Sequence, residues 1–296
     1  MMSLRPKISL RRVRTMALFP ILGAGALIST AAAPQTAGTD YFTYRAGARI
    51  VAMPADADIS EMSSSPFNLI DESASTDWTG EAGQAVFVLE LSEETELSRI
   101  AFDTAGLNRD RKAPRGFTVA LSNTSASSGF EDVLSGELRM NANGQSFAFK
   151  PEDRPVGRWV RLTIESNHGD DYTGMTGFHG YGRQTTATAS TPDLTGNYDG
   201  ASGWGWIHLK QEGDRVAGCY EYQRGEFTGT VDGRVLTLDI VDTSSDESKT
   251  RLTGIFQLTP DGRGIVGLVR GVDRASRDSY AAYYSARKVG RSAGGC

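Results

Sequence analysis

Histidine and cysteine, which supply much of the chemistry of catalytic and metal sites, are scarce in this chain. Its 296 residues include two cysteines and three histidines, and the histidines at 168, 179 and 208 are too far apart in sequence to form a short metal-binding motif. Catalysis requires a nucleophile with a base, a suitably placed carboxylate pair or an open metal site. We find no such arrangement in the sequence and expect a protein that is not an enzyme.

Long apolar runs are missing after residue 33, so we expect no transmembrane segment in the mature protein. Residues 1–33 combine five basic side chains, an apolar run over 17–28 and a small-residue exit over 29–33. This order is typical of a cleaved signal peptide, which predicts a secreted or periplasmic protein. The net charge of −5 includes this basic head, so the remainder is more acidic still and disfavours nucleic acid as a partner.

The two cysteines, Cys219 and Cys296, gain significance if the chain is exported, because oxidising compartments favour disulfides. Val216 and Tyr220 alternate with Cys219, which places the cysteine on the outer side of a strand if the other two are buried. Cys296 ends a glycine-rich tail. We therefore predict a Cys219–Cys296 disulfide, with two free thiols as the alternative.

Helical periodicity is also absent: no segment after residue 40 keeps an amphipathic stripe over three turns, whereas alternating apolar residues recur throughout. The sequence predicts an all-β chain. Residues 184–192 are uncharged, rich in threonine and end in Pro192, which is typical of a linker. We expect a first domain over 41–183 and a second over 193–296, the latter a small antiparallel barrel or meander with close turns.

Five segments of the first domain occur in an order that resembles a known family. They are Phe67–Trp78, Val86–Leu91, Leu97–Phe102, Phe117–Asn123 and Arg158–Ile164. Over about residues 48–183 this order resembles the discoidin, or coagulation factor 5/8 type C, domain. The resemblance implies a galactose-binding-like jelly-roll β-sandwich whose ligands bind at loops. It does not imply a catalytic role.

The resemblance also implies a candidate calcium site, because carbohydrate-binding relatives use an aspartate near the position of Asp71. Asp71, Glu72, Ser73 and Thr76 offer oxygen atoms of the kind that calcium prefers. His179 stands near the place where such relatives carry a further acid, which departs from the pattern. We therefore consider a structural calcium ion at Asp71, Ser73 and Thr76, although His179 in place of an acid argues against it. We expect no other cofactor.

Two loops of the first domain carry side chains suited to a saccharide. Residues 107–115 form a basic cluster, and residues 166–173 combine amide, imidazole, carboxylate and phenol groups. Arginine forks can bind hydroxyls or carboxylates with paired hydrogen bonds. The candidate ligand-binding residues are Arg109, Arg111, Lys112, Arg115, Asn167, His168, Asp170, Asp171 and Tyr172. The alternative is a pair of solvated loops without a ligand.

The second domain resembles, more faintly, small lipocalin-like barrels of bacterial envelope proteins, over residues 193–288. The similarity is carried by Leu194–Tyr198, Trp204–Gln211 and Val216–Tyr220. Strand alternation predicts that Trp204, Trp206 and His208 share one face, at a ligand mouth or at the barrel bottom.

Together these observations predict an exported, non-catalytic protein that binds a carbohydrate or cell-envelope glycan through the first domain. The alternative is an envelope scaffold or protein-interaction module with a protein partner and no sugar ligand.

Overall fold

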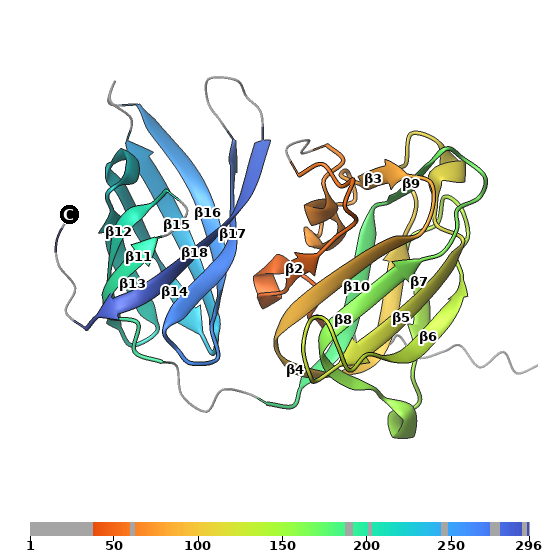
Figure 1. Ribbon diagram of the computed structural model, residues 1–296, viewed down its shortest axis with the longest axis horizontal. Coiled ribbons are helices and arrows are strands. Elements are labelled where there is room, and N and C mark those ends of the chain that lie inside the picture. Colours follow the sequence, from red (N-terminus) through yellow and green to blue (C-terminus); the bar gives the residue numbers. More distant parts are fainter. Residues whose placement is uncertain are drawn as a thin grey trace, which may run out of the picture. The chain divides into compact units, whose positions relative to one another are not determined.

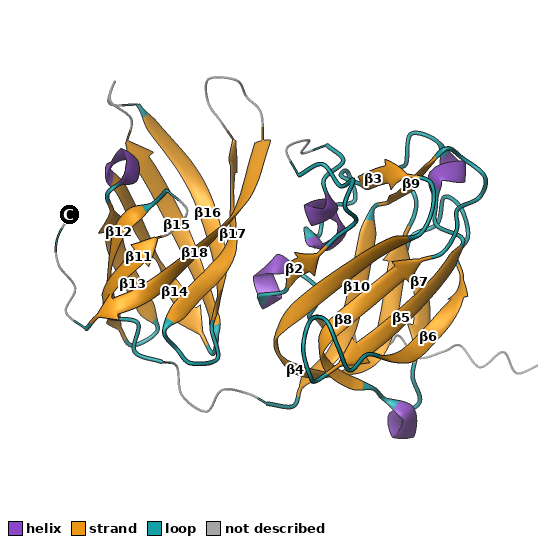
Figure 2. Ribbon diagram, viewed as in Figure 1, coloured by secondary structure: helices purple, strands orange, loops and turns teal. Residues whose placement is uncertain are grey.

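The structure, a computed structural model, describes residues 38–59, 63–186, 192–200, 203–243, 248–272, 279–291 and 295. In this part of the chain β-strands dominate and the helices are short 3-10 turns (Figure 2). The predicted signal peptide over 1–33 and most of the predicted linker over 184–192 lie outside the described residues. The described residues contain no helix long and apolar enough to cross a membrane.

The first domain is a β-sandwich built around one long strand, β4 (Ala85–Asp103), as Figure 1 shows. The principal sheet has the order β1-β10-β4-β8-β5-β6, with β2 and β7 also paired to β4, and β3 pairs separately with β9. The other strands are β1 (Thr39–Asp40), β2 (Arg49–Ala52), β3 (Trp78–Glu81), β5 (Gly116–Ser122), β6 (Glu131–Glu137), β7 (Gln145–Ala148), β8 (Val156–Ile164), β9 (Tyr172–Met175) and β10 (Gly177–Gln184). Short 3-10 turns lie at Tyr44–Ala46, Pro66–Ile70, Asp110–Lys112 (η3) and Pro151–Asp153.

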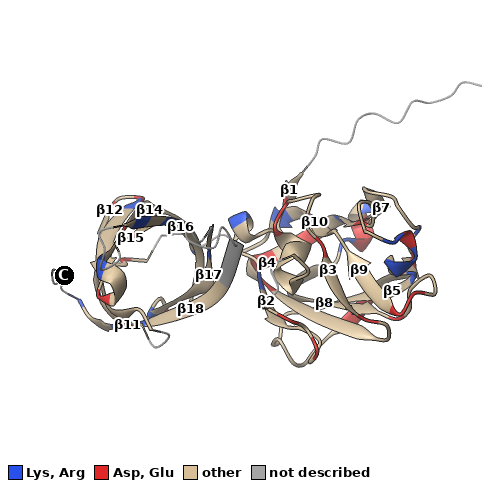
Figure 3. Cartoon of the chain, turned by 90° about the horizontal axis from the view of Figure 1, so that it is seen from above, with Lys and Arg blue, Asp and Glu red and all other residues tan. Residues whose placement is uncertain are grey.

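Strand alternation builds the core of the sandwich as predicted. Val160, Leu162 and Ile164 of β8 are all fully buried, while the residues between them are partly exposed. Trp78 is 1% exposed and meets the Phe87 ring edge-on at 4.7 Å, so it fills the core rather than serving as a ligand platform. Basic and acidic residues are interspersed over the strands and loops rather than segregated, as Figure 3 shows.

The second domain is a closed barrel of eight consecutive antiparallel strands, which confirms the predicted antiparallel barrel (Figure 1). Closure removes the exposed strand edges of an open sheet, because β18 pairs back to β11. The strands are β11 (Gly196–Gly200), β12 (Gly205–Glu212), β13 (Arg215–Tyr220), β14 (Gly225–Asp232), β15 (Val235–Thr243), β16 (Lys249–Leu258), β17 (Gly264–Val272) and β18 (Ser279–Gly290). A 3-10 turn, η5 (Tyr222–Arg224), joins β13 to β14.

The prediction that Trp204, Trp206 and His208 share one face is wrong. Trp204 is 6% exposed and stacks on Tyr220 with ring centroids 4.7 Å apart, inside the barrel, whereas Trp206 is 47% exposed. The reason is Gly205, whose φ of 67° is left-handed and interrupts the extended backbone between the two tryptophans. Alternation applies only from β12 onward, after that turn.

Cys219 lies on the side of β13 opposite the buried Val216 and Tyr220, as the alternation predicted. The described part of the chain holds no free cysteine. Cys296 lies outside the described residues, so its pairing with Cys219 stays a prediction.

Candidate functional site

The two loops that the sequence singled out meet at one end of the sandwich. The first connects β4 to β5 and contains η3, and the second connects β8 to β9. An isolated antiparallel bridge joins Pro114 to Asn167, and the Arg115 amide donates to the Ser166 carbonyl at 2.7 Å. Segments about fifty residues apart in sequence are thus held together by backbone hydrogen bonds.

Arg111 fastens the second loop to the first. Its Nε donates to the His168 carbonyl at 3.3 Å and its Nη2 donates to the Gly169 carbonyl at 2.8 Å. Gly169 has a φ of 90°, and a Cβ there would stand 2.7 Å from Arg111 Nη2. A glycine is therefore required both by the backbone and by the approach of the guanidinium. This geometry gives Arg111 a positioning role.

Asn167 and His168 also use their polar atoms within the loops. Asn167 Nδ2 donates to the carbonyls of Asp170 and Tyr172 at 2.8 and 2.9 Å, and its Oδ1 accepts from the Gly169 amide. His168 Nε2 lies 2.9 Å from the Leu138 carbonyl, which ties a third loop to the cluster. Asn167 and His168 therefore shape the loops through these hydrogen bonds.

The exposed part of the cluster centres on Tyr172. Its side chain is 45% exposed, and two cations lie over its ring: Arg109 Cζ at 5.5 Å and Lys112 Nζ at 5.6 Å from the centroid. Arg109 also pairs with Asp170 at 3.1 Å, and that carboxylate accepts the Tyr172 amide. The cation–π contacts and the ion pair restrict the orientation of the ring.

The remaining predicted residues lie at the margin of this cluster. Arg115 pairs with Glu137 at 3.2 Å, and both side chains are more than half exposed. The Asp171 carbonyl accepts the Ala82 amide, while its side chain is exposed. Glu81 was not predicted, although it lies opposite Tyr172 in the β3–β9 pair. No local pattern could have revealed it, because this pairing joins segments about ninety residues apart.

The oxygen atoms proposed for calcium already hold their own loop together. Asp71 Oδ1 accepts the Ser73 amide and Oδ2 accepts the Thr76 hydroxyl, each at 2.9 Å, while Glu72 pairs with Arg45 at 3.2 Å. Across the described residues, no group of three or more acidic, histidine or cysteine side chains is arranged to hold a metal. Asp71, Ser73 and Thr76 thus form a hydrogen-bonded turn, and structural calcium stays an untested prediction that this geometry does not favour.

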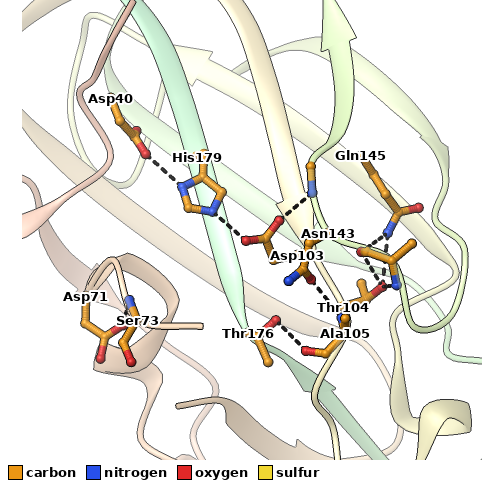
Figure 4. A network of polar contacts seen from close by, with 12 residues as sticks. Asp40, Asp71, Ser73, Asp103, Thr104, Ala105, Asn143, Gln145, Thr176 and His179 are labelled. Atoms are coloured by element: carbon orange, nitrogen blue, oxygen red, sulfur yellow. Dashed lines mark hydrogen bonds and ion pairs between the residues drawn. The ribbon is translucent and has the colours of Figure 1, made fainter. Parts of the chain in front are cut away.

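His179 instead takes part in a polar network, shown in Figure 4. Its Nδ1 lies 2.7 Å from Asp40 and its Nε2 lies 3.3 Å from Asp103, which in turn accepts the Gly144 amide. Burial alone would lower the pKa of His179, but its hydrogen bonds to Asp103 and Asp40 outweigh burial and raise that pKa from 6.5 to about 9. The network joins the first strand of the sandwich to β10 and β4.

Comparison with known proteins finds a family model that matches part of the chain. The family model described as "Sad1 / UNC-like C-terminal" matches residues 61–184. No curated protein matches the chain.

Several solved structures are similar to the sandwich. The family 32 carbohydrate-binding module of AlyQ, solved with 4,5-unsaturated mannuronic acid, is 18% identical, with a TM-score of 0.34 over 45% of this chain and 92% of that one. A family 32 module from Clostridium perfringens, solved with GalNAc-beta-1,3-galactose, is 13% identical, with a TM-score of 0.36 over 45% and 93%. The family 32 module of Streptococcus pneumoniae EndoD is 12% identical, with a TM-score of 0.40 over 49% and 100%.

The family match covers the segment from before β3 to the end of β10. The predicted β-sandwich is confirmed for this part of the chain, and the family match supports a galactose-binding-like domain.

Proposed function

We propose that this chain is an exported, non-catalytic protein that binds a carbohydrate through the loops 107–115 and 166–173. One observation carries the proposal: the two loops are held together and present the exposed Tyr172 ring close to Arg109 and Lys112. Sites on loops that a rigid scaffold positions are a common location for ligand binding.

The chemistry of this cluster suits a sugar ring. An aromatic face covers the apolar C–H side of a pyranose, while cationic N–H groups donate to its oxygen atoms. Because Arg111 and Asn167 hold the loops by hydrogen bonds, little ordering is needed when a ligand binds. Pre-organisation of this kind favours affinity.

The carboxylate in the cluster has a structural role. Asp170 accepts the Tyr172 amide and pairs with Arg109, so it holds the loop and the cation in place.

A protein-interaction role is the second candidate, and the barrel supplies the observation that favours it. A groove of about 920 Å³ crosses β13 to β17 and is lined by apolar residues such as Phe227 and Leu252 together with polar ones such as Asp239 and Arg251. Trp206 and Tyr222 are also about half exposed on this domain. These features fit a macromolecular partner at the barrel and require no sugar.

A matched pair of tyrosine variants tests the proposal. Tyr172 and Tyr222 are 45% and 54% exposed, one on each domain. We expect the secreted chain to bind members of a broad glycan array, Tyr172→Ala to lose that binding by about tenfold or more, and Tyr222→Ala to keep it. Absence of any glycan ligand, or loss of binding only in Tyr222→Ala, contradicts the proposed site.

A further inference from the structure

Lys112 is the most unusual cation of the sandwich. It lies in η3 and is 6% exposed, yet it forms no ion pair with any carboxylate in the part of the chain that the structure describes. Its Nζ lies 5.6 Å from the centroid of the Tyr172 ring. The stem of Lys112 is buried while its ammonium nitrogen reaches solvent, since Nζ is not among the fully buried polar atoms that lack a hydrogen-bond partner.

Several other cations of the sandwich are paired with carboxylates. Arg49 and Arg158 both contact Glu90, and the more exposed Arg154 and Arg183 both contact Glu96. Lys112 instead lies near an aromatic ring, as Arg99 does over Tyr181, and its ring belongs to the place where the two loops converge.

Arg111, next to Lys112 in sequence, adds to the local positive potential. Its guanidinium contacts two carbonyls and no carboxylate, so its charge is also left without an opposite charge in direct contact. Arg109 is half exposed and forms an ion pair with Asp170. Two cations at this site therefore lack a carboxylate partner, although the protein carries a net charge of −5.

We propose that the site selects an acidic saccharide, with the carboxylate of a uronic acid residue paired to Lys112 Nζ and its pyranose ring against Tyr172. The inference rests on the proposed function and specifies its ligand class. A hydrogen bond between an ammonium group and a carboxylate is stronger than the corresponding bond from the ammonium group to a neutral hydroxyl. The acidic remainder of the protein repels polyanions elsewhere, which restricts them to this site.

Two sugars that differ only at C6 provide the test. Digalacturonate and digalactose, with matched linkage, carry a carboxylate and a hydroxymethyl group at otherwise identical rings. We expect the secreted full chain to bind digalacturonate about tenfold or more tightly than digalactose in calorimetric titration. Dimannuronate against dimannose extends the comparison to a second ring stereochemistry.

The variant Lys112→Met keeps the length and apolar stem of the side chain and removes its charge. We expect it to abolish the preference for the acidic sugar while leaving the weaker neutral binding in place. Lys150→Met, at an exposed lysine elsewhere in the sandwich, is the matched control and should preserve the preference. Circular dichroism spectra and melting curves of both variants establish that they are folded.

The wild-type chain provides a second measurement that does not depend on the variant. Raising the salt concentration from about 0.05 to about 0.5 M should reduce the preference for digalacturonate, because screening weakens the charge interaction. Equal affinity for acidic and neutral sugars overturns the inference and leaves the proposed function standing. No binding of any sugar defeats the proposed function itself.

Discussion

The two domains differ in how their strands are connected. In the barrel, two-residue turns such as 213–214 and 233–234 connect several strands. In the sandwich, connections of ten residues or so carry the cations and the exposed Tyr172 ring. Both domains fill their cores with aromatic rings, so the difference lies in the loops: the longer loops of the sandwich have room for a polar cluster.

The same contrast predicts where each domain is sensitive to substitution. The barrel depends on closure of its sheet between β18 and β11, which pair over few residues. The sandwich depends on side chains that hold its loops and its first strand, since β1 is two residues long. Each of the following changes tests one of these dependencies.

The predicted disulfide should give the largest effect, because it would cross the seam where the barrel closes. Gly290 of β18 lies opposite Asn197, Asn197 opposite His208, and His208 opposite Cys219, on four adjacent strands. At about 4.8 Å per strand, Gly290 and Cys219 are about 14 Å apart along the sheet. The six residues that follow Gly290 can span about 20 Å, so Cys296 can reach Cys219.

Removing this bridge should lower the free energy of unfolding by about 4 kcal/mol, the size expected for a ring of this length. Cys219→Ser and Cys296→Ser should have equal effects, and the double variant should show no further loss. Denaturant unfolding of protein secreted under oxidising conditions gives these values. Two titratable thiols in the native protein, or unequal losses in the single variants, would falsify the pairing.

An intermediate effect is expected in the sandwich, at His179. Its pKa is raised from 6.5 in the unfolded chain to about 9 in the folded one, so the protonated imidazole stabilises the fold. This contribution is fully present below about pH 6.5 and is lost as the pH rises through 9. The separation of the two pKa values corresponds to at most about 3 kcal/mol. Asp40, Asp103 and Tyr181 are the titratable groups that face the ring.

His179→Gln keeps the ability to donate a hydrogen bond and removes the charge. We expect it to destabilise the protein at pH 6 and to differ little from the wild type at pH 10. His208→Gln, on the barrel, serves as the control, since its Nδ1 contacts the neutral Asn197 side chain. A loss of stability in His179→Gln that is the same at both pH values contradicts a role for the charge.

Some features of the sandwich could be predicted from the sequence and others could not. The buried strands were predictable, because the alternation in Val160–Ile164 encodes which side faces the core. The network at His179 was not, because Asp40, Asp103 and His179 come from three strands whose pairing depends on the whole sheet. The loops 107–115 and 166–173 were predicted from their side chains as candidate ligand-binding loops, and the structure brings them together.

Residue roles within those loops could not be derived from residue type. Arg111 and Lys112 are adjacent and chemically similar, yet one holds two carbonyls and the other is nearly buried beside Tyr172. Loop side chains have no fixed period that separates inward from outward positions, in contrast to a strand. The distinction depends on the left-handed turn at Gly169, which lets the second loop curl over Arg111.

Arg111→Ala shows whether the sandwich loops are as pre-organised as the comparison with the barrel suggests. Each hydrogen bond from the guanidinium to a carbonyl contributes about 1 kcal/mol or somewhat more, so we expect a loss of about 1–3 kcal/mol. Arg115→Ala removes an exposed ion pair and should cost less than about 1 kcal/mol. Because Arg111 positions the second loop, its loss should weaken acidic and neutral sugars alike, whereas Lys112→Met affects the acidic sugar alone. Hydrogen exchange at residues 166–173 should accelerate in Arg111→Ala and stay unchanged in Arg115→Ala. If Arg111→Ala instead weakens only the acidic sugar, with exchange unaltered, then Arg111 contacts the ligand directly and Lys112 does not act alone.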